Sequence, residues 1–430
     1  MDRTDRTDPS DPSDDKSNVK DHPWSRIAAL KPASTATRPA VAPPNAQGLL
    51  EILGAEPRSN RCGEHLVVRR RYSEPRPFRA APRALRLIAP GAAPEESDPR
   101  RWLFLDTETT GLAGGTGTYA FLVGIAWWDD DGFVVEQYFM RNHAEEASLL
   151  LELAEVLAER RPLVTFNGKS FDWPLLETRY RMTRIGPAPS LSLHLDMLHP
   201  ARQLFRLRLK SVALSELERH VLSLDRGYDI PSETIPGRYF DFLRGGPAQP
   251  VAEIFHHNQL DLCGLAALSA HITQMLEQPE SADCESSELF GMSRLLQRRG
   301  ENQLAFTTYE RALAGDLPSD AQRVAKHELA LSAKRQGRTE RANELWHELL
   351  EGDDPAPEAH EHLAIYYEHH ARQLDQAVAL ARQAQIRLRE ALNRRLISLA
   401  AYQRWHARFQ HRLARLLEKR HHQDTKTPRD

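Results

Sequence analysis

Residues 102–111 read WLFLDTETTG, an apolar run that ends in two carboxylates and a glycine. The part before Asp106 is apolar on both faces, as expected of a central strand that is covered on each side. Side chains alternate along a strand, so Asp106 and Glu108 point to one face and Thr107 points to the other. Two carboxylates at the end of a buried strand are costly unless a cation lies between them. The stretch therefore favours a metal site, with an ordinary solvated strand end as the alternative.

The segments around this strand alternate between strand and helix patterns from residue 100 to about residue 275. Strands are predicted at 101–107, 119–128, 133–140 and 162–166, and helices at 144–160, 171–183, 210–221 and 251–275. The sequence DDDG at 129–132 is a strong hairpin signal between the second and third strands. Three antiparallel strands, a helix, another strand and more helices resemble the ribonuclease H fold more closely than a doubly wound sheet. We therefore expect an α/β domain with a mixed sheet flanked by helices.

A third carboxylate follows the fourth predicted strand, in the sequence FNGKSFDWP at residues 166–174. Ser170 is expected to cap the next helix, which places Asp172 in its first turn, pointing back at the strand ends. The alternative is a carboxylate that only stabilises the helix dipole. Asn167 and Lys169 are candidates for phosphate contact, although each could simply shape the turn.

The last acidic element is FHHNQLD at residues 255–261, within a predicted helix. Asp261 lies four residues after His257, so the two side chains share one helical face. His256 points further round the helix but could still reach from an irregular first turn. A histidine one turn from a carboxylate can act as a general base, because its pKa lies near the working pH.

In this order the acidic residues resemble the DEDD (DnaQ-like) 3′–5′ exonuclease superfamily, whose first motif is close to DTETTG. The four acidic positions of that superfamily are matched by Asp106, Glu108, Asp172 and Asp261. From residue 45 to about 275 the chain looks like the YprB-like branch of ribonuclease H-like proteins. The shared features are the glycine-rich loop after the first motif, the FNGKSFD segment and the H-N-x-x-D ending. This resemblance implies His257 as the base, with His256 as the alternative.

The resemblance implies a metal-dependent 3′–5′ exonuclease that hydrolyses phosphodiester bonds of single-stranded DNA or RNA. Two Mg²⁺ or Mn²⁺ ions about 3.5–4 Å apart would activate a water and stabilise the leaving oxygen. Hard cations prefer carboxylate oxygens, so the four acidic residues would be the metal ligands. The expected contacts to nucleic acid come from Thr109, Gly111, Asn167 and Lys169. Two alternatives stay open: an inactive nuclease domain that serves as an interaction platform, and a structure-selective endonuclease on the same fold.

The composition is that of a soluble protein, with 430 residues, 40% hydrophobic content and a formal net charge of −3. No stretch approaches the roughly 18 apolar residues of a membrane span, and the N-terminal residues lack the apolar centre of a signal peptide. Three cysteines show no C-x-x-C spacing, as expected of reduced thiols in a cytoplasmic protein. We expect a disordered tail at 1–45, an extension at 46–99 that packs on the nuclease domain, and that domain at 100–280.

Residues 286–420 are predicted to form a helical domain, followed by a disordered tail at 421–430. A repeated pattern reads Met292…Gly300…Ala305, then Leu329…Gly337…Ala342, then Leu363…Ala371…Ala377. Its spacing is close to the 34 residues of a tetratricopeptide helix pair, in which small residues allow helices to cross closely. We expect a tetratricopeptide-like (TPR-like) array that binds a protein partner, with an ordinary helical bundle as the alternative.

The last predicted helix, at about 381–420, is locally basic. One helical face carries Arg404, Arg408, Arg412, Arg415 and Lys419. Such a stripe could follow a phosphate backbone. It could equally be the solvated face of a helix that closes the array.

Overall fold

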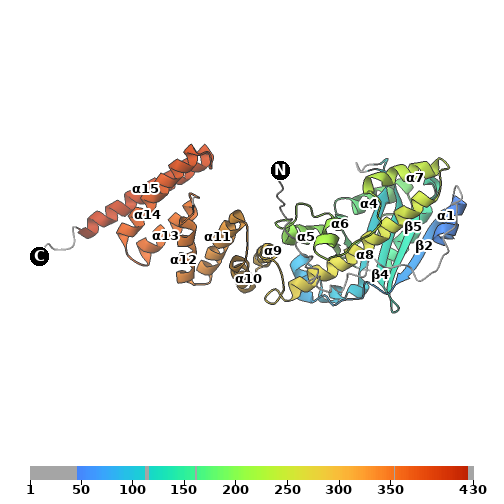
Figure 1. Ribbon diagram of the computed structural model, residues 1–430, viewed down its shortest axis with the longest axis horizontal. Coiled ribbons are helices and arrows are strands. Elements are labelled where there is room, and N and C mark those ends of the chain that lie inside the picture. The colour runs from blue at the N-terminus through green and yellow to red at the C-terminus, as the bar shows by residue number, and fades with distance from the viewer. Residues whose placement is uncertain (1–45, 112–115, 160–161, 353, 425–430) are drawn as a thin grey trace, which may run out of the picture. The chain divides into compact units, whose positions relative to one another are not determined.

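The structure is a computed structural model that describes residues 46–111, 116–159, 162–352 and 354–424 (Figure 1). It contains two compact units. The sheet unit holds the described residues up to Arg202 together with Ser211–Glu277, and the helical unit holds Gln203–Lys210 and the described residues from Gln278 onward. The predicted disorder of residues 1–45 lies outside the described residues.

The sheet unit is built on a mixed sheet, which confirms the predicted fold class. Its described strands are β1 (Glu56–Asn60), β2 (Gly63–Tyr72), β3 (Leu103–Thr109), β4 (Ala120–Trp128), β5 (Phe133–Phe139), β6 (Leu163–Thr165) and β7 (His194–Asp196). They lie in the order β1-β2-β5-β4-β3-β6-β7. The strands β3, β4 and β5 form the expected antiparallel meander, and β6 runs parallel to β3. The sheet therefore places β3, with its two carboxylates, between an antiparallel and a parallel neighbour.

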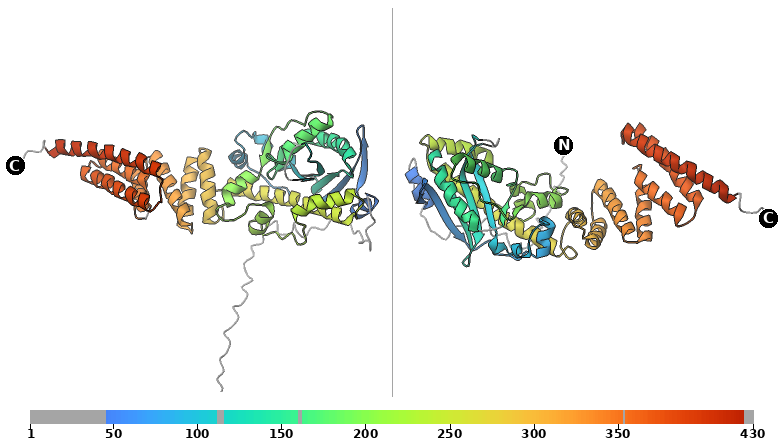
Figure 2. Two further views of the ribbon diagram at one scale, coloured as in Figure 1. Left: turned by 90° about the horizontal axis from the view of Figure 1, so that it is seen from above. Right: turned by 180° about the vertical axis from the view of Figure 1, so that it is seen from behind.

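Helices cover both faces of this sheet (Figure 2). The described α-helices of the sheet unit are α1 (Ala46–Leu53), α2 (Pro82–Ile88), α3 (Glu146–Glu159), α4 (Asp172–Thr183), α5 (Leu198–Phe205), α6 (Leu214–His220), α7 (Ile235–Leu243) and α8 (Gln249–Glu277), and α5 runs past the unit's boundary at Arg202. Short 3₁₀ helices lie at Pro94–Ser97, Pro99–Arg101, His143–Glu145 and Ser232–Thr234. The sequence pattern did not predict α5, α7 or β7.

The two faces of the sheet can be told apart at neighbouring residues of β5. Gln137 donates from Nε2 to the Phe255 carbonyl of α8 at 2.8 Å. Tyr138 points the other way and stacks on His65, whose Nδ1 lies 2.9 Å from the Ser148 hydroxyl of α3. Because adjacent strand residues face opposite sides, α8 and α3 cover opposite faces.

The residues before β3 belong to the same sheet. In β2 the residues Leu66–Tyr72 pair antiparallel with β5, and β1 pairs with β2 as the outer strand. The region predicted as an extension thus adds a hairpin to the sheet.

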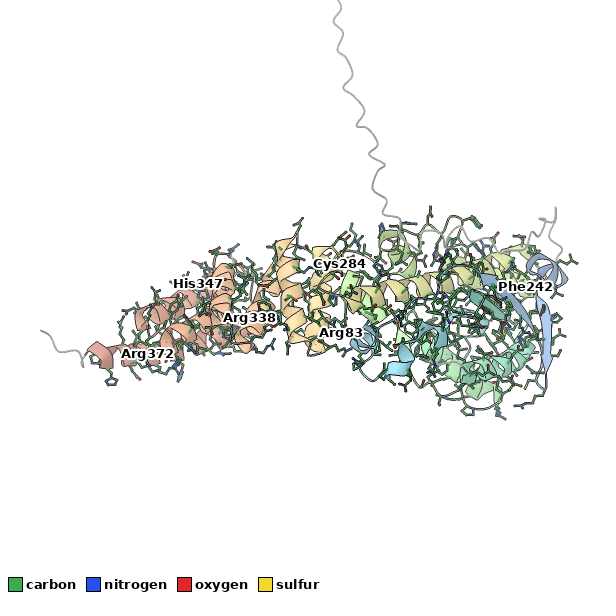
Figure 3. All side chains as sticks on the ribbon, turned by 90° about the horizontal axis from the view of Figure 1, so that it is seen from below. Arg83, Phe242, Cys284, Arg338, His347 and Arg372 are labelled. Atoms are coloured by element: carbon green, nitrogen blue, oxygen red, sulfur yellow. The ribbon has the colours of Figure 1, made fainter. Side chains whose placement is uncertain are left out.

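The helical unit consists of hairpins of consecutive helices. Its described helices are α9 (Ser286–Arg298), α10 (Asn302–Ala314), α11 (Ser319–Arg335), α12 (Thr339–Leu350), α13 (Pro357–His369), α14 (Leu374–Asn393) and α15 (Leu399–Asp424). The turns inside the first two hairpins place Gly300 and Gly337 at positive φ, +79° and +74°, which glycine adopts without strain. Arg372, labelled in Figure 3, has the corresponding conformation in the third turn, with φ +56°. The three turns and the helices that they join bear out a repeating helical array.

The repeated apolar positions of the array are buried. Met292, Leu329 and Leu363 each have no exposed surface, and Ala305, Ala342 and Ala377 are at most 3% exposed. The small residues let the second helix of each hairpin approach the first closely.

The predicted single helix at 381–420 is wrong. The chain breaks after Asn393, where Arg395 has φ +59°, and α15 folds back on α14. This reversal buries Val378 and Leu388 against Trp405 and Phe409 in one apolar cluster, which a straight helix could not do. The helix α15 continues to Asp424, and residues 425–430 of the predicted tail lie outside the described residues. No helix in the described ranges is long and apolar enough to span a membrane.

Candidate metal centre

Asp106 of β3 is held by an amide from α8. Nδ2 of Asn258 donates to Oδ2 of Asp106 at 2.8 Å, and Oδ1 of Asn258 accepts from Nε2 of Gln137 at 2.9 Å. The Gln137 contact fixes which end of the Asn258 amide faces the carboxylate. Gly124 lies opposite Asp106 in β4, and a Cβ there would lie 2.0 Å from Oδ1 of Asn258. A glycine is therefore required at this position so that the amide can reach Asp106.

Glu108 meets two residues of α8. Glu108, His257 and Asp261 each offer one ligand atom, and these atoms lie within 4.8 Å of one another. His256 is exposed, whereas His257 is 5% exposed and faces this group. Of the two histidines proposed from the sequence, the structure brings His257 to the carboxylates.

Asp172 reaches the site from the opposite face of β3. Its Oδ1 accepts a hydrogen bond of 2.5 Å from the hydroxyl of Thr107, the residue between the two carboxylates of β3. Asp172 is not within the 4.8 Å group, but its charge contributes to raising the pKa values of Asp106 and Glu108. The four predicted carboxylates thus surround β3 from both sides.

The loop before Asp172 is organised by Asp196, and not by Ser170. Phe171 precedes α4 and provides no side-chain cap, so the predicted capping role of Ser170 is wrong. Asp196 instead accepts from the backbone N–H groups of Asn167 at 2.8 Å and Lys169 at 3.1 Å. The side chains of Asn167 and Lys169 remain exposed beside the site. Their predicted contact to nucleic acid stays a prediction.

The loop after β3 is stabilised by hydrogen bonds of its own threonine side chains. The hydroxyl of Thr109 donates to the carbonyl of Gly111 at 3.0 Å, and Thr109 is 7% exposed. Thr110 Oγ1 accepts from the backbone N–H of Tyr119 at 3.0 Å. The hydroxyl proton of Thr109 therefore shapes this loop, and its expected contact to nucleic acid, like that of Gly111, stays a prediction. Residues 112–115 of the glycine-rich loop lie outside the described residues.

The carboxylates of the centre repel one another. Burial, together with the charges of Asp261 and Asp172, raises the pKa of Asp106 well above its usual range. Burial and the charge of Asp106 do the same for Glu108, and burial raises the pKa of Asp172 to about 6. A divalent cation would relieve this repulsion, and a set of carboxylate oxygens with one imidazole fits such an ion. The residues present therefore fit the metal that the sequence resemblance implies.

A buried guanidinium joins the centre from the loop between α6 and α7. Arg226 donates to Oδ1 of Asp261, to Oδ2 of Asp229 at 2.9 Å and to Oε1 of Glu218 at 2.7 Å. The Arg226 side chain is only 12% exposed. Gly264 of α8 makes room for Glu218, because a Cβ there would lie 1.7 Å from its Oε1. Arg226 thus fixes the position of Asp261 through a network that the sequence pattern did not reveal.

Asp229 of the same loop holds His257. Its Oδ1 lies 2.7 Å from Nδ1 of His257, whose Nε2 lies 3.5 Å from Oδ2 of Asp261 and 3.3 Å from the hydroxyl of Ser232. Although burial alone would raise it, the pKa of Asp229 falls to about 2 because His257 and Arg226 stabilise the carboxylate. The same hydrogen bond raises the pKa of His257 against the opposing effect of burial. Asp229 could not be predicted from motif spacing, because it reaches His257 only through the folded loop.

Comparison with known proteins relates this chain to one family and to one similar protein. Residues 103–273 match the family described as the RNase_H superfamily. The chain is also 32% identical over 286 residues to YprB of Bacillus subtilis (strain 168), a protein described as uncharacterized. That match covers 65% of this chain and 68% of YprB. The family match spans each of the four carboxylates, His257 and Arg226.

Proposed function

The chain belongs to the ribonuclease H superfamily, and from this we propose that it is a metal-dependent nuclease acting on single-stranded nucleic acid from the 3′ end. The observation that carries the proposal is the convergence of ligand atoms from Glu108, His257 and Asp261 within 4.8 Å. Asp106, on the same face of β3 as Glu108, adds a further carboxylate that Asn258 holds in place. Such a set of acidic residues is typical of a metal-dependent active site, because their mutual repulsion destabilises the metal-free fold.

Asp106, Glu108, Asp172 and Asp261 would hold two Mg²⁺ or Mn²⁺ ions. Bound there, the ions would supply positive charge to the phosphoryl oxygens and lower the pKa of a bound water. Asn258 bonds to Oδ2 of Asp106, so that among the described residues Oδ1 stays available for this purpose, and Arg226 orients Asp261. The carboxylate geometry is therefore set before any ligand arrives.

His257 is the proposed general base. Asp229 accepts from Nδ1–H, which directs the lone pair of Nε2 toward the side where Asp261 and Glu108 lie. Nε2 can then accept the proton of an attacking water, and Asp229 stabilises the resulting imidazolium. His256 is not proposed as the base, because its side chain is exposed on another part of α8.

The helical hairpins that follow the sheet unit in the sequence support the proposal of a TPR-like array. Stacked helical hairpins form extended binding surfaces, which suits the recruitment of a partner molecule. Protein binding through this array is part of the proposal.

The test is cleavage of end-labelled single-stranded DNA and RNA oligonucleotides with Mg²⁺, Mn²⁺ or EDTA. We expect a metal-dependent ladder from the 3′ end, and its loss in Asp106→Asn. Asp241→Asn is the matched control. The side chain of Asp241 in α7 is 73% exposed, and among the described residues its ion-pair partner is the exposed Arg244. Cleavage by Asp106→Asn at the level of the control would refute the assignment. A folded wild-type protein that cleaves neither linear nor circular substrates would favour an interaction platform instead.

A further inference from the structure

The basic face of α15 is not freely solvated. Arg408 donates to Glu361 of α13 at 2.6 Å, and Arg415 donates to Glu368 of α13 at 2.7 Å. Arg412 lies 3.4 Å from both carboxylates. The basic face is therefore partly paired within the helical unit, where α13 supplies counter-charges to the stripe.

The counter-charges are too few to neutralise the stripe. Lys419 also bonds to Glu368, so that two carboxylates face four cations. The charged side chains stay accessible, with Arg408 53%, Arg415 42% and Lys419 45% exposed. An excess of two positive charges therefore faces solvent.

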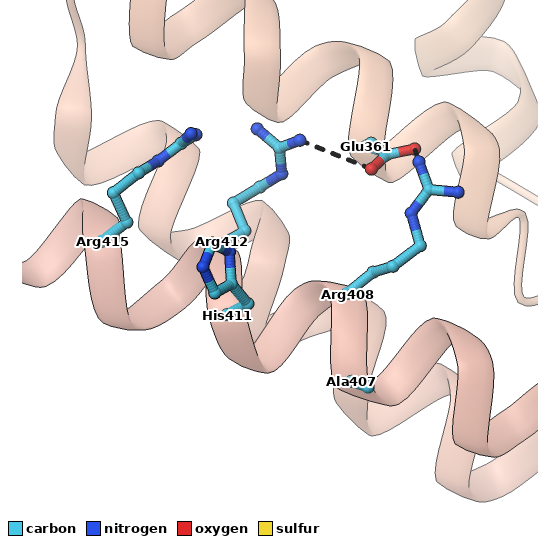
Figure 4. Close-up of a pocket in the computed structure, with 6 residues that line it drawn as sticks. All are labelled: Glu361, Ala407, Arg408, His411, Arg412 and Arg415. Carbon is cyan, nitrogen blue, oxygen red and sulfur yellow. Dashed lines mark hydrogen bonds and ion pairs between the residues drawn. The ribbon is translucent and has the colours of Figure 1, made fainter.

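Part of this cluster lines a pocket of about 400 Å³ (Figure 4). The pocket is formed by Glu361, Ala407, Arg408, His411, Arg412 and Arg415. Nε of Arg415 is buried and has no hydrogen-bond partner. The pocket therefore offers several N–H donors and only one carboxylate.

The guanidinium groups are held in place before any ligand binds. Glu361 accepts from Arg408 and Arg412, which keeps the two groups on the same side of α15, as Figure 4 shows. Arg408 also lies over the ring of Trp405, with 4.7 Å between its Cζ and the ring centroid. Trp405 in turn packs in the apolar cluster between α14 and α15. Groups ordered in this way lose little conformational entropy when an anion binds.

We propose that this pocket binds the phosphate backbone of single-stranded nucleic acid, as an additional site for the substrate of the proposed function. Residues four apart on α15, such as Arg408 and Arg412, are separated by about 6 Å along the helix axis, which gives a regular row of cations. Phosphate oxygens accept hydrogen bonds directly from such cations, and every nucleotide of a single strand supplies one phosphate. An acidic peptide can also pair with a cluster of arginines, and the test below separates the two ligands. Ala407 is the single apolar residue among those that line the pocket. The chemistry thus favours a polyanion of regular charge over an acidic peptide.

The test measures binding of a fluorescent single-stranded oligonucleotide to the full-length Asp106→Asn protein as a function of salt. The test variant adds Arg408→Gln and Arg415→Gln. The matched control adds Arg382→Gln and Arg389→Gln, which remove the same charge from exposed positions of α14. On a single strand, each lost phosphate contact makes the negative slope of log affinity against log salt shallower by about 0.7. Two lost contacts therefore weaken binding by roughly 25-fold at about 0.1 M salt, relative to a 1 M reference.

Glu361→Gln should change the binding affinity in the opposite direction. It removes the counter-charge without removing a donor, so we expect tighter binding and a steeper salt dependence. Arg408→Lys with Arg415→Lys keeps the charge and should retain most of the affinity, which separates loss of charge from loss of folding.

Equal affinities and equal slopes for the test and control variants would overturn the site. Binding of a Glu-rich peptide that depends on Arg408 and Arg415, with nucleic-acid binding unchanged, would also overturn it in favour of a protein ligand. The outcome is separable from that of the nuclease proposal. Cleavage by the wild-type protein with pocket-independent binding would refute this inference alone, and pocket-dependent binding without cleavage would refute the nuclease alone.

Discussion

Replacement of Arg226 by glutamine tests whether the buried network around Asp261 is held together by this one cation. Arg226 contacts Glu218, Asp229 and Asp261, and its side chain is 12% exposed. Removal of one partner from a buried ion pair costs about 3–5 kcal/mol, because the remaining charge is left uncompensated. We expect Arg226→Gln to lower the free energy of unfolding of the sheet unit by about this amount at pH 8.

The cost should depend on pH in a defined direction. Burial already raises the pKa of Glu218 to about 7, although Arg226 opposes this rise. Without Arg226 the pKa of Glu218 rises further, so the folded state binds a proton more tightly than the unfolded state does. A carboxyl group of this kind loses stability as the pH rises through its folded pKa. The destabilisation by Arg226→Gln should therefore be largest at pH 8 and smaller at pH 5.5.

Hydrogen exchange followed by mass spectrometry provides the assay, since peptides from α8 report on the sheet unit alone. Arg244→Gln is the control: Arg244 is 74% exposed and pairs with an exposed aspartate, so its loss should change stability by no more than about 0.5 kcal/mol. A cost below about 1 kcal/mol for Arg226→Gln at pH 8, or an equal cost at both pH values, would contradict the role assigned to Arg226.

Three further predictions concern the metal centre. Gly124→Ala should displace Asn258 from Asp106, cost about 1–3 kcal/mol of stability and reduce metal affinity about 10- to 100-fold, as measured by unfolding and by Mn²⁺ titration; unchanged metal affinity would show that Asn258 does not position Asp106. Asp229→Asn should lower the pKa of His257, so the acid limb of the kcat–pH profile should move to lower pH while kcat falls; an unmoved limb would argue against His257 as the base. Because the pKa of Asp172 is raised to about 6, the metal-free fold should lose stability as the pH rises from about 4 to 6, and Mg²⁺ should raise the Tm more at pH 8 than at pH 5. A larger rise in Tm at pH 5 would contradict carboxylate ligation.

The fold could be predicted from the sequence because its main elements carry strong local patterns. The DDDG turn and the apolar runs on either side of it predict the meander, and the recurring glycines predict the helical hairpins. The break after Asn393 could not be predicted in this way. The sequence on both sides of it is helical, and only the burial of Trp405 and Phe409 against α14 decides that the chain reverses.

The residues of the candidate centre likewise fall into two groups, those that a local pattern predicts and those that it does not. Asp106, Glu108, His257 and Asp261 are visible as close pairs, because the periods of a strand and a helix put each pair on one face. Arg226 and Asp229 lie in an irregular loop, where no period relates sequence position to direction. Their roles follow from contacts that exist only after α6, α7 and α8 have packed together.

The placement of Thr107 between Asp106 and Glu108 has a mechanical consequence. Thr107 holds Asp172 of α4, whereas Glu108 faces His257 and Asp261 of α8 and Asp106 bonds to Asn258 of α8. The acidic residues therefore belong to helical layers on opposite sides of one sheet. Cations shared by these residues would cross-link the three layers at a single strand end. Occupancy would then restrain the sliding of α4 against α8, and loss of the ions would release both layers together.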